Sequence, residues 1–339
     1  MTQCPVCLTK VEERNYKEVY VSPYNNQEYK RYECPNCDLH WWEPLKIIPE
    51  FYESEFIDAY IGFHTVQREK LGVNHEPFFK YFPKNVRGRL LDIGCGDGVF
   101  LRYAKGAGFE VWGIDFDSKS VEVARKGVGV DTIYVMSLEE FYDFAKKKGL
   151  KFDVITFFEV LEHQDKPREF LDLVKYLLKD GGYIAGSVPN RESYFWQELN
   201  QKYSHGDFPP NHFLRFSDVA LRKCLEIAEF DDVRIYKLDF TFEELYPSFV
   251  EKKIFGNIDS LKVKLKAKFL DGNEKLAKAI KVEELKEHSD KRLGIIALMT
   301  VKLLRNIVLL PFTIFYLHKL KKNGIHLFFI GKLGNNSSY

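Results

Sequence analysis

Several features that define other classes of protein are missing from this sequence. No run of eighteen uncharged residues occurs in the 339 positions, so a membrane-spanning helix is not expected. No basic start followed by an apolar segment precedes the first cysteine pair, so we expect a cytoplasmic rather than a secreted protein. A net charge of only +1 argues against a nucleic-acid-binding field over the whole chain. The content of 45% hydrophobic and 29% charged residues excludes a disordered or collagen-like chain.

The charge is unevenly distributed along the chain. From Lys291 onward there are eight basic and no acidic residues, whereas the first 290 residues carry 42 basic and 49 acidic groups. The apolar run Leu293–Leu317 lies in this basic end and is interrupted by Lys302, Arg305 and Pro311. We expect an amphipathic helix that contacts a membrane surface, such as the inner membrane face, or a second copy of the chain. Burial against a sheet is an equal alternative.

Cysteine is scarce, and four of the six cysteines form two Cys-x-x-Cys pairs near the start. This spacing is typical of a metal site rather than of disulfides, and four thiolates complete a tetrahedral zinc shell. The metal is therefore expected to be structural. Residues 1–45 resemble a zinc ribbon; His40 is a less favoured substitute ligand, and four buried free thiols are the alternative. The predicted ligands are Cys4, Cys7, Cys34 and Cys37.

Residues 89–107 read as a buried strand, a glycine turn at Gly94–Gly98 and a helix. A second strand ends at Asp115, 23 positions after Asp92, where an acid of a doubly wound domain binds a ribose. The following strands and helices alternate, which predicts an α/β fold with a parallel sheet and a ligand at the carboxyl ends of its strands. The further strands are expected at 133–135, 152–157, 183–188 and 233–238, and the further helices at 117–126, 138–148 and 167–179.

The glycine turn indicates which ligand is bound. A dinucleotide fingerprint needs a glycine at position 99, where this chain has Val99. The run Leu91-Asp-Ile-Gly-Cys-Gly-Asp-Gly98 instead resembles the first motif of class I S-adenosylmethionine-dependent methyltransferases. The resemblance covers about residues 88–240 and implies a seven-stranded Rossmann-like sheet.

The same resemblance implies the contacts to S-adenosylmethionine. Asp92 would lie near the ammonium group, Asp115 would bind both ribose hydroxyls and Phe116 would flank the adenine. Ser137 stands where many relatives carry an acid, so the contact to the adenine edge departs most from the family pattern. The full predicted set is Asp92, Gly94, Cys95, Gly96, Asp115, Phe116, Ser137, Leu138 and Phe158.

The segment after the fourth strand, Glu159-Val-Leu-Glu162-His163, resembles a subfamily that includes ubiquinone-biosynthesis, small-RNA-end and many sugar methyltransferases. Methyl transfer to a hydroxyl requires a proton acceptor, and we expect His163 in that role, with His212 as a second imidazole. On a helical turn Glu159, Glu162 and His163 could share one face. Small-RNA-end enzymes hold Mg²⁺ with such residues, so the resemblance also allows Mg²⁺ at Glu159, Glu162, His163 and His212; a purely structural role is the alternative.

The family fold ends in an antiparallel strand, and Ile325–Lys332 matches it. Residues 241–323 would then be a helical insertion before that strand, with a Lys/Glu-rich helical pair at 251–291. The expected domains are the ribbon at 1–45, a helical linker or lid at 46–87, the core at 88–240, the insertion at 241–323 on the acceptor side, and the last strand and tail at 324–339.

The sequence therefore predicts a zinc-ribbon methyltransferase that acts on oxygen or nitrogen of a small-molecule or sugar/glycan-type acceptor. Fusions of this kind look similar to enzymes of sugar, polysaccharide and natural-product modification. An RNA methyltransferase is one alternative, but the first 50 residues hold no excess of basic over acidic residues, so nucleic acid is a disfavoured partner. A non-catalytic scaffold that binds the cofactor is the other alternative, against which the intact glycine and acid motifs argue.

Overall fold

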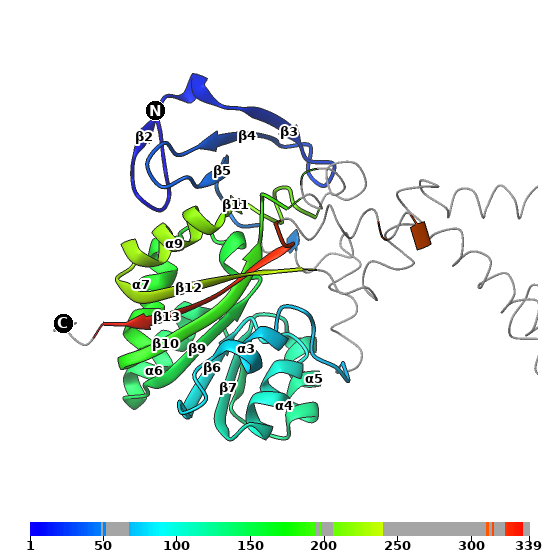
Figure 1. Ribbon diagram of the computed structural model, residues 1–339, viewed down its shortest axis with the longest axis vertical. Coiled ribbons are helices and arrows are strands. Elements are labelled where there is room, and N and C mark those ends of the chain that lie inside the picture. The colour runs from blue at the N-terminus through cyan, green and yellow to red at the C-terminus, as the bar shows by residue number, and fades with distance from the viewer. Residues whose placement is uncertain are drawn as a thin grey trace, which may run out of the picture. The chain divides into compact units, whose positions relative to one another are not determined.

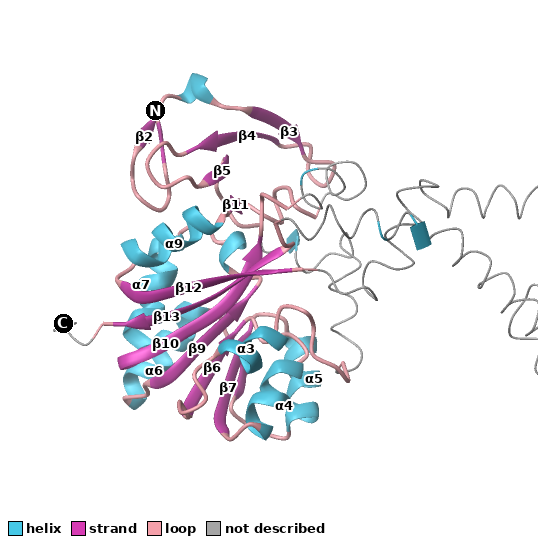
Figure 2. Ribbon diagram, viewed as in Figure 1, coloured by secondary structure: helices cyan, strands magenta, loops and turns pink. Residues whose placement is uncertain are grey.

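The largest sheet in the described part of the computed structural model is a mixed sheet of seven strands (Figures 1 and 2). The structure describes residues 1–48, 50–51, 68–193, 206–239 and 323–334, together with residues 197, 310, 311 and 314. The chain divides into two compact units, Met1–Asp239 with Asn323–Tyr339, and Phe240–Lys322. The predicted helical pair at 251–291 and most of the apolar run 293–317 lie outside the described residues. No helix in the described part is long and apolar enough to cross a bilayer.

The order of the strands confirms the predicted doubly wound fold. They lie in the order β12-β13-β10-β9-β6-β7-β8, and β13 alone in this sheet runs antiparallel to its neighbours. The chain thus leaves after β12 and returns between β12 and β10 as β13. The strands are β6 (Gly88–Ile93), β7 (Phe109–Asp115), β8 (Ile133–Val135), β9 (Phe152–Phe158), β10 (Leu178–Pro189), β12 (Phe230–Leu238) and β13 (His326–Leu333).

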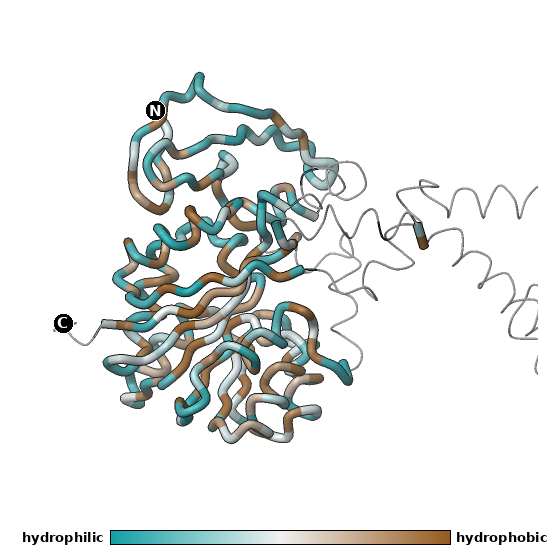
Figure 3. Tube along the Cα trace, in the orientation of Figure 1, coloured by the Kyte–Doolittle hydropathy of each residue, from teal (hydrophilic) through white to brown (hydrophobic). Residues whose placement is uncertain are grey.

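Helices cover both faces of this sheet (Figure 1). Successive residues of a strand point to opposite faces, so both faces have apolar side chains against which helices pack. Leu90 belongs to the apolar cluster of α3, α4 and α5, and its neighbour Leu91 belongs to the cluster of α6, α7 and α9. Figure 3 shows hydrophilic and hydrophobic residues alternating along these helices. The helices are α3 (Glu76–Tyr81), α4 (Val99–Gly106), α5 (Ser118–Val128), α6 (Leu138–Lys148), α7 (Pro167–Leu177) and α9 (Asp218–Ile227).

Local signals start the helices directly behind the strand ends that form the site. The Asp117 carboxylate accepts hydrogen bonds from the main-chain N–H groups of Lys119 and Ser120 and so caps α5. Ser137 and Glu140 form a reciprocal capping box at the start of α6. Because the helices begin at these caps, the residues between each strand and the next helix lie at the carboxyl edge of the sheet. This edge is here called the rim.

The amino-terminal ribbon has a two-stranded and a four-stranded sheet. The four-stranded sheet has the order β11-β5-β4-β3. One of its two edge strands, β11, comes from a distant part of the chain. The elements are β1 (Thr2–Gln3), β2 (Lys10–Val11), η1 (Glu13–Asn15), β3 (Glu18–Val21), β4 (Glu28–Glu33), β5 (His40–Glu43) and β11 (Leu214–Arg215).

Candidate functional site

The two cysteine pairs form matching turns. The N–H of Leu8 donates to the Cys4 carbonyl at 3.0 Å, and the N–H of Asp38 donates to the Cys34 carbonyl at 3.1 Å. Leu8 and Asp38 both have positive φ, 61° and 62°. This left-handed residue after each second cysteine closes the turn tightly enough to direct both thiols of a pair inward.

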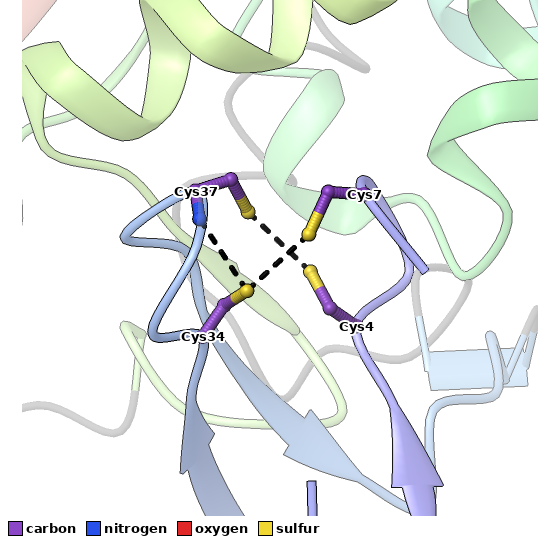
Figure 4. A group of neighbouring side chains, drawn as sticks. All are labelled: Cys4, Cys7, Cys34 and Cys37. Atoms are coloured by element: carbon purple, nitrogen blue, oxygen red, sulfur yellow. Dashed lines mark hydrogen bonds between the residues drawn. The ribbon is translucent and has the colours of Figure 1, made fainter. Parts of the chain in front are cut away.

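The four sulfurs point toward one another from these two turns (Figure 4). Sγ of Cys4 lies 3.5 Å from that of Cys37, Sγ of Cys7 lies 3.3 Å from that of Cys34, and all four sulfurs lie within 4.8 Å of one another. Four thiolates at such separations fit a tetrahedral zinc ion, so the cluster is consistent with the predicted zinc site. His40 is not one of the grouped residues: its Nδ1 lies 2.8 Å from the Arg31 guanidinium.

The glycine turn between β6 and α4 is tied to the neighbouring strand. The N–H groups of Gly94 and Cys95 both donate to the Ile114 carbonyl, at 2.9 and 3.0 Å. Gly96 has φ +50°, and a Cβ built there would meet no atom within 4 Å. The turn therefore presents open backbone at Gly96, where a ligand can approach the main chain closely.

The Cys95 side chain does not take part in this open surface. Cys95 is 6% exposed, and a Cβ added to Gly113 would lie 3.0 Å from its sulfur. Burial raises the pKa of the thiol well above its ordinary value. The thiol is thus a packing group over β7, and only the Cys95 backbone faces the turn.

Asp115, at the end of β7, is fixed by main-chain donors. Its Oδ2 accepts from the N–H of Gly96 at 2.9 Å, and its Oδ1 accepts from the N–H of Asp117 at 3.0 Å. Burial raises the pKa of this carboxyl, and the two N–H donors oppose the rise. The next side chain, Phe116, is 58% exposed. An anchored carboxylate beside an exposed ring is the arrangement expected for a ribose and its attached base.

Asp92 lies within strand β6, inside the sheet. It is 3% exposed, and the Thr156 hydroxyl donates to its Oδ1 at 2.7 Å. Burial raises the pKa of Asp92 to about 8. The Thr156 hydrogen bond opposes this rise, and the Asp115 charge adds to it. A nearby positive charge stabilises the ionised form of such a buried carboxyl, which supports the predicted position of an ammonium group.

Three other predicted cofactor residues lie around the same edge of the sheet. Ser137 uses its hydroxyl to cap α6, accepting from the N–H of Glu140 at 3.2 Å, and Leu138 is 7% exposed. The ring of Phe158 packs edge-on against His75, with centroids 4.7 Å apart, rather than extending into open space.

Sequence reasoning assigned no role to individual residues of the segment before the core. Arg68 reaches the glycine turn: its main-chain N–H and its guanidinium donate to the fully buried Asp97 at 2.9 and 2.8 Å. Asn74 Oδ1 and His75 Nδ1 are buried without a hydrogen-bond partner in the described part of the chain. Burial lowers the pKa of His75 to about 4, so its ring is neutral at pH 7. No local motif marks these residues, because their contacts depend on tertiary packing.

Glu159 has a strained backbone directly after β9. Its φ of 55° is in the left-handed region, which is costly for a residue with a side chain. Ser187 donates to Oε1 at 2.7 Å, and Nδ1 of His326 lies 3.1 Å from Oε2. Burial alone would raise the pKa of Glu159, but His326 and Ser187 bring it below the ordinary value. The 3₁₀ helix η3 (Leu161–His163) begins only after Glu159. The predicted helical face shared by Glu159, Glu162 and His163 is therefore not formed.

Glu162 is buried without a hydrogen-bond partner. Its side chain is 1% exposed, and neither carboxylate oxygen has a partner among the described residues. Burial raises the pKa of Glu162 well above its ordinary value, and the Glu159 charge adds to the rise. Oε1 lies 4.0 Å from Nε2 of His163. Because buried polar groups are nearly always paired, this carboxyl marks the place of a ligand or an ordered water.

Two imidazoles meet beside Glu162. The rings of His163 and His212 lie 4.7 Å apart at an interplanar angle of 74°. Nδ1 of His163 is 2.6 Å from the Asn211 carbonyl oxygen, and Nδ1 of His212 is 3.2 Å from Oδ1 of Asp207. Both oxygens can only accept from an imidazole, so the Nδ1 that faces each oxygen carries a proton.

The electrostatics distinguish the two rings. Burial, followed by the neighbouring His212, lowers the pKa of His163 to about 3. His212 instead has the Asp207 carboxylate behind it, and Asp207 is held in turn by Arg215 at 2.7 Å. An imidazole backed by a carboxylate is better able to take up a proton than one backed by a carbonyl.

The predicted magnesium set is only partly brought together. Glu162, His163 and His212 have ligand atoms within 4.8 Å of one another, but Glu159 is directed to Ser187 and His326. Mg²⁺ prefers oxygen ligands, whereas two of these three donors are imidazole nitrogens. The structure does not support Mg²⁺ at this position.

The comparisons with known proteins agree with this geometry. A family model described as a methyltransferase domain matches residues 64–235, which is half of the chain. The chain belongs to the class I S-adenosylmethionine-dependent methyltransferases. The glycine turn and Asp115 lie inside the matched region.

Curated relatives of this methyltransferase include two ubiquinone biosynthesis O-methyltransferases. That of Bordetella avium is 28% identical over 193 residues, which cover 53% of this chain and 71% of the relative. That of Bordetella bronchiseptica is 33% identical over 192 residues, with the same coverages of 53% and 71%.

A solved structure shows the same fold. It is the complex of the Trm112 methyltransferase activator of Haloferax volcanii with a methyltransferase, in which the matching chain has a TM-score of 0.50 and 14% identity. The match covers 84% of this chain and 99% of that one. At this identity the similarity concerns the fold alone.

Proposed function

We propose that this methyltransferase transfers the methyl group to an oxygen or nitrogen of a small-molecule or sugar/glycan-type acceptor, with a hydroxyl favoured. The observation that carries the proposal is the pair of the half-buried His163 and the buried His212, which have ligand atoms within 4.8 Å of the partnerless Glu162. This group lies at the rim, after β9, and the glycine turn lies after the adjacent strand β6. A methyl acceptor must approach from this side if it is to reach the donor.

The donor side of the proposed site consists of the predicted cofactor residues. Asp115 would bind the ribose hydroxyls, Asp92 would compensate the ammonium group, and the open backbone at Gly96 would lie against the amino acid end. Phe116 and Leu138 would flank the adenine. When bound, S-adenosylmethionine supplies a methyl group on a positively charged sulfur, which is open to in-line displacement.

The acceptor side uses the two imidazoles in different roles. We assign the uptake of the acceptor proton to His212 rather than to His163, the base expected from the sequence, because the Asp207 carboxylate stabilises the imidazolium that forms. His163, neutral across the physiological range, would accept a hydrogen bond and orient the acceptor. Glu162, whose pKa burial raises well above its ordinary value, would hydrogen-bond to a polar atom of the acceptor. These roles favour a hydroxyl, which must lose its proton as it is methylated.

The names of the curated relatives support the same choice, since they describe O-methylation of a small molecule. An RNA acceptor has less support, because the ribbon residues 1–50 carry no basic excess. A non-catalytic scaffold would not need an oriented imidazole pair.

The other expectations from the sequence remain part of this proposal. The domain limits 1–45, 46–87, 88–240, 241–323 and 324–339 are proposed as the functional division. Contact of residues 293–317 with a membrane surface or a second copy, and a cytoplasmic location, are proposed on the sequence alone.

Label transfer tests the proposal. Zinc-loaded protein is incubated with methyl-labelled S-adenosylmethionine and extract fractionated into RNA, lipid-linked glycan, nucleotide-sugar and quinone pools. We expect label in a small-molecule or glycan pool, and the loss of that label with His212→Asn. Label in RNA alone would contradict the proposed acceptor class.

A further inference from the structure

The segment Asp207–Ser217 carries His212 and is almost entirely buried although it contains only two strand residues. Phe213, Phe216 and Ser217 have no exposed surface, and Asn211 and His212 are 5% and 7% exposed. Segments of this kind normally run over the surface. Something must therefore cover this one, and the described contacts show that the ribbon does.

The main chain links the ribbon to the imidazole pair through one residue. Strand β11 completes the ribbon sheet by pairing with β5, with Leu214 opposite Trp41. The Trp42 N–H donates to the Phe213 carbonyl at 3.0 Å. The Phe213 N–H in turn donates to the Glu162 carbonyl at 3.0 Å. Phe213 thus bridges the ribbon and the η3 segment that contains Glu162 and His163.

Side chains strengthen this link. The ring of Tyr20, on β3, stacks on Phe208 with centroids 4.4 Å apart and an interplanar angle of 26°. Trp42 packs against both rings, at 6.0 and 5.7 Å. On the other side of the segment, Asp38 pairs with Arg191 at 2.6 Å and accepts from the Ser217 hydroxyl. The apolar core of the ribbon and that of the α6, α7 and α9 face form one continuous cluster.

The covered segment sets the orientation of both imidazoles. Its Asn211 carbonyl holds Nδ1 of His163, and its Asp207 carboxylate holds Nδ1 of His212. The glycine turn is fixed differently, by Ile114, Asp115 and Arg68, which belong to the core and its preceding segment.

We propose that the zinc ribbon is a positioning element of the acceptor site, and that Tyr20 is its positioning residue. Tyr20 acts through Phe208 and the segment 207–217 on the orientation of His163 and His212, without contributing to donor binding. The proposal rests on the proposed function in that these two rings face the acceptor. Misplacement of such groups by a fraction of a bond length is enough to lower turnover strongly.

The strand that carries Tyr20 also offers a matched control. Val19 lies on the same strand but is 45% exposed, facing away from the core. The variants Tyr20→Ala, Tyr20→Phe and Val19→Ala are prepared as full-length, zinc-loaded protein. Zinc content is measured for each, and affinity for S-adenosylhomocysteine is measured by calorimetry. Imidazole ¹⁵N NMR, assigned with His163→Gln and His212→Gln, reports the two rings without any need for an acceptor.

We expect Tyr20→Ala to keep its zinc and to bind S-adenosylhomocysteine within about twofold of the unaltered protein, while the His163 and His212 signals shift or broaden and turnover falls about tenfold. Tyr20→Phe, which retains the stacked ring, and Val19→Ala should match the unaltered protein. Unchanged imidazole signals in Tyr20→Ala would overturn the proposal, as would an equal effect of Val19→Ala. Should Tyr20→Ala fail to fold, Phe208→Leu replaces it with the same expectation. Failure of the proposed function alone would give a different result. Tyr20→Ala would still shift the His163 and His212 signals, but the unaltered protein would methylate no acceptor.

Discussion

The main-chain N–H of Gly96 donates a 2.9 Å hydrogen bond to the carboxylate of Asp115. This bond joins the glycine turn after the first core strand to the acid at the end of the second, so the two parts of the proposed donor site are fixed as one unit. Because Gly96 also faces open space, a ligand can contact the backbone of the turn and the carboxylate at the same time.

The first prediction concerns Asp115. Asp115→Ala removes the proposed acceptor for two ribose hydroxyls, and each hydrogen bond to a charged group contributes about 1.5–3 kcal/mol. We therefore expect the affinity for S-adenosylhomocysteine, measured by calorimetry, to fall at least about a hundredfold. Glu122→Ala, at an exposed site on α5, is the control and should bind normally. Normal binding by Asp115→Ala would show that the ribose lies elsewhere.

The second prediction is a release of protons when the donor binds. Asp92 has a pKa raised to about 8, so it is largely protonated in the ligand-free protein at pH 7. A nearby ammonium group lowers that pKa and drives the proton off. The binding enthalpy of S-adenosylhomocysteine at pH 7 should thus depend on the ionisation enthalpy of the buffer. Asp92→Asn should abolish this dependence; an unchanged dependence would assign the proton to another group.

The third prediction separates the two sides of the site. His212→Asn should lower turnover by about a hundredfold or more, the usual contribution of a general base, with the affinity for the donor within about twofold. Because the pKa of His163 is about 3, that ring stays neutral from pH 5 upward and should add no inflection to the rate profile there. Glu226→Ala, on the exposed side of α9, is the control. Turnover by His212→Asn at the unaltered rate would give His212 a structural role.

The fourth prediction is that magnesium is not required. Glu159 is turned away from the imidazole pair, which leaves a nitrogen-rich set that Mg²⁺ does not favour. Turnover should change by less than about twofold between excess EDTA and added Mg²⁺, when followed over minutes in zinc-loaded protein. Activity that disappears with EDTA and returns only with Mg²⁺ would restore the magnesium interpretation.

The fifth prediction concerns the cysteine cluster. Cys37→Ser removes one of four converging sulfurs, so the protein should lose its zinc and the amide-exchange protection of strands β3 to β5. Cys224→Ser is the control, since Cys224 is buried in α9 outside the cluster, and it should retain one zinc per chain by elemental analysis. Full zinc retention by Cys37→Ser would exclude it as a ligand.

Much of the fold could be predicted because its signals are local. Residues 89–93 and 152–157 are short apolar runs bounded by turn residues, and the strands β6 and β9 lie there within one residue at each end. The helix expected at 138–148 is α6 (Leu138–Lys148), which begins behind the capping box of Ser137 and Glu140. The cysteine spacing likewise predicted the cluster.

The details of the site could not be predicted, because they depend on residues far apart in the chain. The direction of the Glu159 side chain follows from a positive φ and from His326, more than 160 positions away. Arg68 reaches Asp97 across 29 positions, from a segment with no regular pattern. Asp207 and Arg215 are close in the chain, but their buried ion pair belongs to no recognisable motif. The two-residue strand β11 is too short to show any periodicity.

A crystal structure of the zinc-loaded protein with S-adenosylhomocysteine tests the central claim most directly. The account predicts the ribose hydroxyls on Asp115 and the thioether sulfur facing the side of the rim that holds His163 and His212. A nucleoside bound away from Asp115, or a sulfur facing away from the two imidazoles, would contradict it.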